Sequence, residues 1–201
     1  MNEITPVQLP TYKEIEILHK KYAPSPRVFE LVFSHCVIVS EIASALMESC
    51  KGSIDKDLVI AGCLLHDIGV YKVMDPEEGL VEPYICHGIR GAEILRHEGC
   101  DECLCRIAER HTGVGLTKQQ IIKSNLPLPH QDFVAETPEE RLVMYADKFH
   151  SKVPQFNSLS LALTSAKKFG YDNEARFNAL LAEFGAPKLD ELAKTYNQNI
   201  V

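Results

Sequence analysis

An apolar run that ends in two polar side chains places the tightest constraint on how this chain can fold. Residues 58–65 read LVIAGCLL, and His66 and Asp67 follow at once. A run of this kind belongs in a core, where a polar group without a partner costs roughly 2–7 kcal/mol. A divalent metal ion would satisfy both side chains together, so this segment points to a buried metal site.

Length and charge narrow the class of protein. With 201 residues, the chain forms one large domain, or a domain with small appendages. The hydrophobic share of 45% and the charged share of 24% are ordinary for a globular protein. The net charge of −7 argues against a nucleic-acid-binding surface. A small phosphorylated substrate is still compatible with that charge, because a metal ion makes its own site locally positive.

The sequence also predicts a protein without a membrane span or an export signal. No apolar run approaches the roughly 20 residues of a transmembrane helix, and residues 1–6 lack the charged start and apolar core of a signal peptide. The seven cysteines are an odd number scattered through helix-like segments, which favours reduced thiols in the cytoplasm. Cys100, Cys103 and Cys105 are clustered, but no second pair of cysteines completes a zinc site.

Helical spacing of apolar residues runs through almost the whole chain, without a convincing alternating strand. We therefore expect an all-α fold, with helices that start at capping sequences such as Ser25-Pro26 and Thr137-Pro138. The expected helices span residues 11–22, 27–50, 55–69, 85–98, 101–112, 118–124, 138 onward, 158–169, 172–184 and 187–197. Residues 72–84 and 114–136 are the expected loops, and the second is long enough to be functional, for example as a lid.

Four more candidate ligands lie at inward-facing or terminal positions of these helices. His35 lies on the apolar stripe of its helix, and Asp147 follows an apolar stretch by about one turn. His87 begins a helix directly before Gly88, and His111 ends another. A lone interior aspartate is strongly disfavoured unless it is paired or coordinated. Nitrogen and carboxylate ligands without thiolates suit iron, manganese, zinc, cobalt or magnesium.

The order of these histidines and aspartates resembles the HD superfamily of metal-dependent phosphohydrolases. The chain is similar in particular to the small bacterial and archaeal HDIG-domain proteins, and His87 and His111 resemble the two extra histidines of the binuclear subgroups. The likeness covers residues 25–152 and implies a single-domain helical bundle of the HD type. In that scheme, residues 1–24 form an N-terminal helix that packs on the core, 25–152 form the metal-binding core, and 153–201 add C-terminal helices to the same domain.

The resemblance implies a role for each ligand. The first metal would be held by His35, His66, Asp67 and Asp147, and the second by His87 and His111, with Asp67 as the bridging, catalytic residue. The implied cofactor is one or two divalent transition metals (Fe, Mn, Co, Zn or Ni), with Mg also compatible. A metal-activated hydroxide would then hydrolyse a phosphate ester or anhydride, foremost in a nucleotide.

Cations and departures from the family pattern refine this expectation. Arg90, Lys118 and Lys148 are the candidate substrate-binding cations, although each one singly could be a solvated surface charge. Many HDIG proteins carry lysine directly after the glycine, where this chain has Val70. The glycine-tyrosine-proline signature of the HD-GYP subgroup is absent, which argues against cyclic di-GMP as the substrate.

Four other histidines lie outside the candidate ligand set, and two other functions are compatible with that set. Of the four remaining histidines, His150, which follows Asp147 by one turn, is the best candidate to support a ligand, whereas His19, His97 and His130 are expected at the surface. HD-like folds with six such ligands also include di-iron oxygenases, and a non-catalytic metal- or nucleotide-binding module could keep the same residues without turnover. The sequence leaves the oligomeric state open, with a homodimer as one option.

Overall fold

Helices make up most of the structure. The computed structural model describes residues 8–48, 50, 52–75, 77 and 79–201. Its longer helices are α1 (Tyr12–Tyr22), α2 (Pro26–Met47), α3 (Lys56–Leu65), α5 (His87–His97), α6 (Glu102–Arg110), α8 (Pro138–Ala146), α9 (Leu159–Lys167) and α10 (Tyr171–Phe184). Shorter helical pieces are α4 (Val70–Val73), α7 (Lys118–Lys123), α11 (Asp190–Thr195) and the 3-10 helices η1 (Tyr84–Cys86) and η2 (Asp147–Phe149). The prediction of an all-α fold is confirmed.

Capping side chains explain where the main helices begin. The Thr11 hydroxyl accepts a hydrogen bond from the Glu14 amide, and the Glu14 carboxylate accepts one from the Thr11 amide, ahead of α1. The hydroxyls of Ser25 and Thr137, each directly before a proline, accept hydrogen bonds from the amides of Val28 and Glu140 at the starts of α2 and α8. Such caps satisfy backbone N–H groups that have no partner inside the helix, so the predicted starts of these helices are confirmed.

Five two-residue strands lie within the described part of the chain, where the sequence indicated none. Strands β1 (Met74–Asp75) and β2 (Gly79–Leu80) form an antiparallel pair inside the expected loop 72–84. Strand β3 (His150–Ser151) pairs antiparallel with β4 (Gln155–Phe156), which pairs in parallel with β5 (Asn199–Ile200). Elements this short carry no alternation that a sequence pattern could show.

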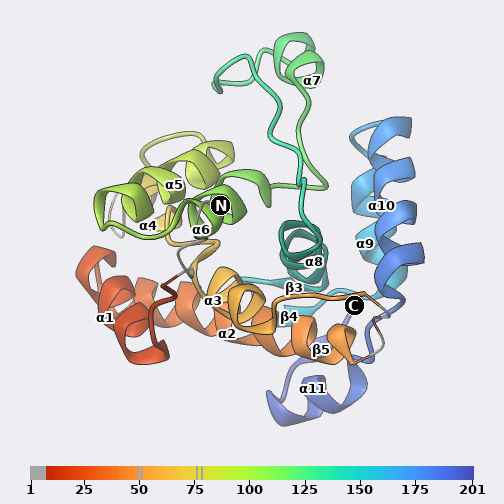
Figure 1. Cartoon of the computed structure of the whole chain (residues 1–201), viewed down its shortest axis with the longest axis horizontal. Coiled ribbons are helices and arrows are strands. Elements are labelled where there is room, and N and C mark those ends of the chain that lie inside the picture. The colour runs from red at the N-terminus through yellow and green to blue at the C-terminus, as the bar shows by residue number, and fades with distance from the viewer. Residues whose placement is uncertain (1–7, 49, 51, 76, 78) are drawn as a thin grey trace, which may run out of the picture.

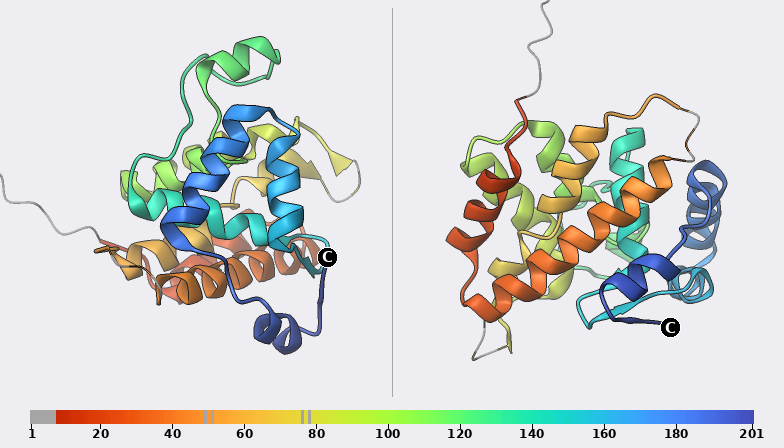
Figure 2. Two further views of the ribbon diagram at one scale, coloured as in Figure 1. Left: turned by 90° about the vertical axis from the view of Figure 1, so that its right-hand side faces the viewer. Right: turned by 90° about the horizontal axis from the view of Figure 1, so that it is seen from below.

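Two apolar cores share α2 and α3. One core includes Val32 and Leu104 and lies among α1, α2, α3, α5 and α6. The other includes Tyr145 and Phe177 and lies among α2, α3 and the helices from α8 onward. Figure 1 shows the first group at the left and α9 and α10 at the right, and Figure 2 shows α2 running diagonally between them when seen from below. His35, on α2, therefore lies where the two cores meet.

Helix α2 is the one described helix that is long and apolar enough to cross a membrane by length and composition. This corrects the expectation that no apolar segment reaches that length. Most of its apolar window is buried against the other helices. A buried core helix passes the same length test, so the finding is weak evidence for a membrane span.

Helix α3 ends at Leu65, four residues before the predicted end at Gly69. The amide of Ile68 donates to the Leu65 carbonyl and that of Val70 donates to the Asp67 carbonyl, so the intervening residues form tight turns. Gly69 lies against α5 so closely that a Cβ there would be 1.9 Å from the His87 carbonyl oxygen. The turn and the close approach together place His66 and Asp67 next to the start of α5.

The long connection between α6 and α8 forms an arm rather than an irregular coil. Leu116 and Phe133 exchange backbone hydrogen bonds, which pair the two sides of the arm. Helix α7 lies at its tip and projects from the body of the molecule at the top of Figure 1. At the root of the arm, Gly113 and Val114 line a cavity that is described below.

Candidate metal centre

Six side chains converge in the middle of the structure. They are His35 from α2, His66 and Asp67 from the turn after α3, His87 from α5, His111 after α6, and Asp147 from η2. All of them except Asp147 are at most 4% exposed. The structure therefore brings all six candidate ligands together, and we call this group the cage.

One half of the cage contains two histidines and two aspartates. The Nε2 atom of His35 lies 3.0 Å from Asp147 Oδ1 and 3.3 Å from Asp67 Oδ2. The Nε2 atom of His66 lies 3.3 Å from Asp67 Oδ2 and 3.4 Å from Asp147 Oδ1. These ligand atoms all lie within 4.8 Å of one another, close enough to hold one ion.

The other half of the cage shares Asp67 with the first. The Oδ1 atom of Asp67 lies 3.4 Å from His87 Nε2 and 3.5 Å from His111 Nε2. The two carboxylate oxygens of Asp67 thus face different groups of histidines. Among the six candidate ligands, Asp67 is the one that belongs to both groups.

The backbone orients three of the four histidine rings. In His66, His87 and His111, the Nδ1 atom lies 2.6–2.7 Å from the carbonyl oxygen three residues earlier. A carbonyl oxygen only accepts hydrogen bonds, so Nδ1 carries the proton. In the neutral ring, Nε2 then presents a lone pair to the middle of the cage, as it does in histidines that bind metals.

A chain of hydrogen bonds orients the fourth ring. The Nε2 atom of His150 donates to Gln198 Oε1 at 3.0 Å, which leaves His150 Nδ1 as an acceptor for His35 Nδ1 at 2.8 Å. Burial lowers the pKa of His150 to about 4, so this ring is neutral and holds one proton. His35 Nε2 then also faces the cage with a lone pair. His150, the best candidate among the remaining histidines, thus lies directly behind the candidate ligand His35.

The donor atoms of the cage fit a divalent cation. His66 Nε2 and both carboxylate oxygens of Asp67 are buried without a hydrogen-bond partner among the described residues. The Nε2 atoms of His87 and His111 lie 3.0 Å apart, and the single N–H of each neutral ring, on Nδ1, already donates to a backbone carbonyl. Two lone pairs that face each other repel, and a buried carboxylate oxygen that accepts no hydrogen bond is costly. A cation between these atoms would satisfy them all.

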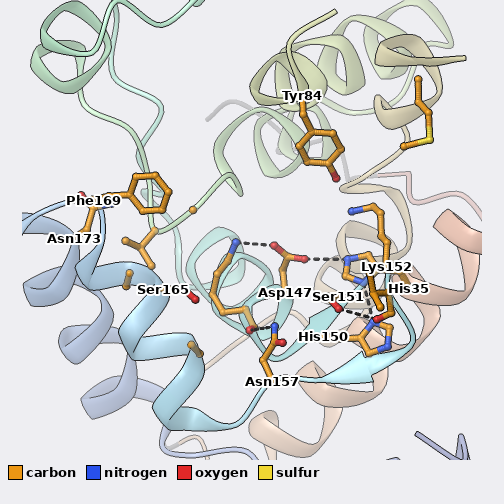
Figure 3. A pocket seen from close by; sticks show the side chains of 17 residues that line it. His35, Tyr84, Asp147, His150, Ser151, Lys152, Asn157, Ser165, Phe169 and Asn173 are labelled. Carbon is orange, nitrogen blue, oxygen red and sulfur yellow. Dashed lines mark hydrogen bonds and ion pairs between the residues drawn. The ribbon is translucent and has the colours of Figure 1, made fainter. Parts of the chain in front are cut away.

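Two lysines add positive charge beside the cage (Figure 3). Lys148 Nζ lies 2.6 Å from Asp147 Oδ2, and Lys152 forms an ion pair with Asp67 Oδ2. Burial alone would raise the pKa of Asp67, but the charge of Lys152 holds that pKa well below its usual range. Burial likewise favours the neutral ring of His87, whose pKa falls to about 3.

Sequence reasoning missed Lys152. This residue lies in the turn between β3 and β4, in a stretch without periodicity or a recognisable motif. Val70, at the position where many HDIG proteins carry lysine, is fully buried. The nearby Lys72 is exposed and lies over the Tyr22 ring. The cation beside Asp67 therefore comes from the β3–β4 turn.

The structure does not bring Arg90 or Lys118 to the cage. Arg90 forms ion pairs with Glu82 and Glu93 beside a separate surface cavity. Lys118 begins α7 on the projecting arm, where its amide donates to Asp132. Of the three cations proposed from sequence, Lys148 alone lies at the cage.

The expectation of a surface position is wrong for His19. Its ring is fully buried, with Nε2 2.8 Å from the Leu64 carbonyl and Nδ1 2.8 Å from the Tyr71 hydroxyl. These two hydrogen bonds explain how a histidine is accommodated in the apolar core between α1 and α3. His97 and His130 are exposed, as expected.

A cavity of about 500 Å³ opens beside the cage. Its lining includes His35, Asp147, Lys148 and Lys152 at one end, and apolar residues of α9 and the following turn at the other. This volume lies in the range of roughly 300–1,000 Å³ that holds small ligands. A molecule in the cavity can therefore contact the cage and both lysines.

The family follows from a direct comparison with known proteins. The HD domain family model matches residues 32–152, which are more than half of the chain and contain all six residues of the cage. The chain belongs to the HD-domain family. The matched residues run from within α2 to Lys152 in the β3–β4 turn.

Three relatives of this HD-domain protein show how far the similarity extends. An uncharacterised protein of Methanocaldococcus jannaschii is 44% identical over 121 residues, which are 59% of this chain and 65% of that protein. A protein of Picrophilus torridus named tRNA (cytidine(56)-2′-O)-methyltransferase is 34% identical over 168 residues, covering 82% of this chain and 46% of that protein. One of the same name from Thermoplasma volcanium is 34% identical over 155 residues, covering 77% and 42%. The chain spans less than two thirds of each relative.

Solved structures show the same fold. The HD domain of the phosphodiesterase PgpH from L. monocytogenes, in complex with cyclic-di-AMP, aligns with a TM-score of 0.52 and 17% identity. That alignment covers 93% of this chain and 99% of the PgpH chain. The PgpH HD domain in a second structure aligns with the same TM-score and 18% identity, over 90% of this chain and 92% of that one.

Proposed function

We propose that this protein is a metal-dependent phosphohydrolase that cleaves a phosphate ester or anhydride of a small molecule, with nucleotides as the favoured class. One observation carries the proposal. The buried His66 Nε2 and Asp67 Oδ1 have no hydrogen-bond partner among the described residues, and the cage to which they belong adjoins a cavity lined by two lysines. This arrangement combines a site for cations with a site for an anion.

The residues of the cage divide into two metal sites that share Asp67. His35, His66, Asp67 and Asp147 would hold one divalent ion, and Asp67, His87 and His111 would hold a second. When bound, such ions lower the pKa of a water molecule and neutralise charge on a phosphoryl group. The lone pairs of the histidines are already directed inward by the backbone, so little reorganisation is needed to bind a metal.

The two lysines would bind the phosphate. Lys148 and Lys152 both line the cavity, and each already contacts a carboxylate of the cage. An ammonium group beside a metal site attracts phosphate oxygens and stabilises the charge that is redistributed when the bond to phosphorus breaks. Asp147, the most exposed residue of the cage, stands at the boundary between the cage and the cavity.

The comparisons favour a nucleotide as the substrate, and they do not support a methyltransferase activity for this chain. The PgpH HD domain, which has the same fold, is in complex with the nucleotide cyclic-di-AMP. More than half of each relative named as a tRNA methyltransferase lies outside the match, so the named activity need not reside in the part that resembles this chain. The net charge of −7 also favours a small substrate over a nucleic acid.

A metal analysis followed by a phosphatase screen tests the proposal. We expect the purified protein to contain a divalent transition metal and to release phosphate from some of a panel of mono-, di-, tri- and dinucleotides. Activity should be lost with a chelator and restored by manganese, cobalt or iron under anaerobic conditions.

Two results would replace the proposal with another function. A strict requirement for oxygen, together with a mixed-valent iron signal, would identify an oxygenase. Retained nucleotide binding without turnover under any metal would identify a non-catalytic binding module.

A further inference from the structure

The cavity beside the cage has an apolar mouth that protein packing leaves uncovered. Phe169 and Val153 are 71% and 66% exposed, the two most exposed of the large apolar side chains in the described part of the chain. Both line the same cavity, although one follows α9 and the other lies in the turn between β3 and β4. Exposed apolar groups that gather at a cavity mark a surface that a ligand covers.

The wall below this mouth is also apolar. Val114, Ala162 and Ala166 line the cavity and are almost fully buried, which leaves a smooth wall without charge. Lys152 and Asp147 lie toward the opposite, cage end of the cavity (Figure 3), and Lys148 forms an ion pair with Asp147. A ligand that fills the whole cavity therefore needs an anionic group at one end and an apolar group at the other.

A polar group at the same end limits what the apolar group can be. Asn173 is 3% exposed and lines the cavity, and its Oδ1 atom accepts hydrogen bonds from Arg176 and Gln120. Arginine can only donate, so the orientation of this amide is determined and its NH₂ group is the free donor. That NH₂ group has no acceptor among the residues that the structure describes. Ser165 also points its hydroxyl into the cavity in Figure 3.

We infer that this end of the cavity binds a flat heteroaromatic ring of the substrate, as in a nucleobase, with Phe169 as its stacking surface. The inference rests on the proposed function, because the ring must be joined to the phosphate that the lysines bind. An aromatic face accepts a ring of this kind by stacking, and the Asn173 amide can donate to a ring nitrogen or carbonyl. We call the end formed by Val114, Ala162, Ala166, Phe169 and Asn173 the ring compartment.

Two substitutions test the ring compartment from opposite directions. Phe169→Ala removes the stacking surface, and Ala166→Leu fills the space that the ring would occupy. For each variant, kcat/KM is measured with ribonucleoside 5′-monophosphates and with glycerol 3-phosphate, which has no ring. We expect the ratio of the nucleotide value to the glycerol phosphate value to fall about tenfold in both variants. Phe169→Tyr should restore the ratio, and Ile17→Ala, at a similarly exposed apolar position on α1, should not change it.

A binding measurement separates this inference from the proposed function. Calorimetry with the nucleosides themselves, which have no phosphate, reports on the ring compartment whether or not hydrolysis occurs. We expect nucleoside affinity to fall about tenfold in Phe169→Ala. Release of phosphate from no substrate would overturn the proposed function, and the nucleoside result would still decide on the compartment. Unchanged ratios and unchanged affinity in both variants, or no nucleoside binding to the wild type, would overturn the ring compartment.

Discussion

At the scale of single residues, Asp67 is the side chain on which the proposed metal centre depends most. Its two carboxylate oxygens face different groups of histidines, and Oδ2 also forms an ion pair with Lys152. Substitution of a residue that two metal sites share should weaken metal binding at both sites. The other residues of the cage each belong to one group.

The first prediction concerns the metal content of two variants. Asp67→Ala should lose both metals and all phosphatase activity, whereas His111→Ala should chiefly weaken the second metal, because His111 belongs to one group only. Elemental analysis of the purified variants measures this directly. His97→Ala is the matched control, since its side chain is 77% exposed and lies outside the cage. Full metal content in Asp67→Ala would show that the ligands have been assigned wrongly.

A second residue-scale prediction concerns His19 and the pH dependence of stability. Burial lowers the pKa of His19 to about 4, against 6.5 in an unfolded chain. Below pH 6.5 the unfolded state therefore gains a proton that the folded state does not, and stability falls until the pH reaches about 4. The loss amounts to about 3 kcal/mol, at about 1.4 kcal/mol per pH unit.

Urea unfolding between pH 7.5 and 4 measures this contribution. His19→Gln removes the titrating group, so the decline of its unfolding free energy with falling pH should be smaller than that of the wild type. The cage titrates in both proteins, and its effect cancels in the comparison. His97→Gln, at an exposed histidine, should keep the wild-type slope. An equal slope in His19→Gln and the wild type would contradict the prediction.

At the scale of elements, the close contact between the turn at Gly69 and α5 holds the two halves of the cage together. A Cβ at Gly69 would lie 1.9 Å from the His87 carbonyl oxygen and 2.3 Å from the Gly91 amide nitrogen. Both are backbone atoms, which cannot move aside as a flexible side chain does. The space between this turn and α5 therefore has no room for a side chain larger than that of glycine.

The prediction at this scale is that Gly69→Ala is severely destabilising. We expect a loss of at least about 2 kcal/mol, because overpacking usually costs about 1–3 kcal/mol and here the clash is with backbone. A shift of α5 would also move His87, so metal content should fall. Gly52→Ala is the control, since a Cβ there meets no atom within 4 Å. Chemical denaturation of both variants measures the difference, and equal stability would contradict the prediction.

The elements also show what the sequence could and could not predict. Caps and periodicity predicted the helices that carry His35 and His87 and the helices that end directly before His66, His111 and Asp147. Lys152 and Phe169 lie in a turn and just beyond a helix, and their place beside the cage depends on how α9 and the β3–β4 turn pack. No local pattern encodes that packing. His19 was misjudged because its two hydrogen-bond partners come from residues 45 and 52 positions away.

At the scale of the whole molecule, the cage joins two apolar cores that share α2 and α3. A metal bound there by the folded state alone stabilises the entire fold, by about 3 kcal/mol when its free concentration is a hundredfold above Kd. Removal of the metal with a chelator should therefore lower Tm, and its return should restore Tm. Differential scanning calorimetry measures both steps, and an unchanged Tm would argue against a metal that is bound in the fold.

Lys152 gives the last prediction, because it and a metal neutralise the same buried carboxylate. Lys152 pairs with Asp67, which is 1% exposed. Without metal, Lys152→Met leaves that charge without its lysine partner, and breaking a buried pair costs about 3–5 kcal/mol. With metal bound, the ion supplies the missing charge, so the variant should lie much closer to the wild type. Unfolding in chelator and in metal measures the two gaps, with Lys72→Met as the exposed control. Equal gaps under both conditions would mean that Lys152 and the metal act on Asp67 independently.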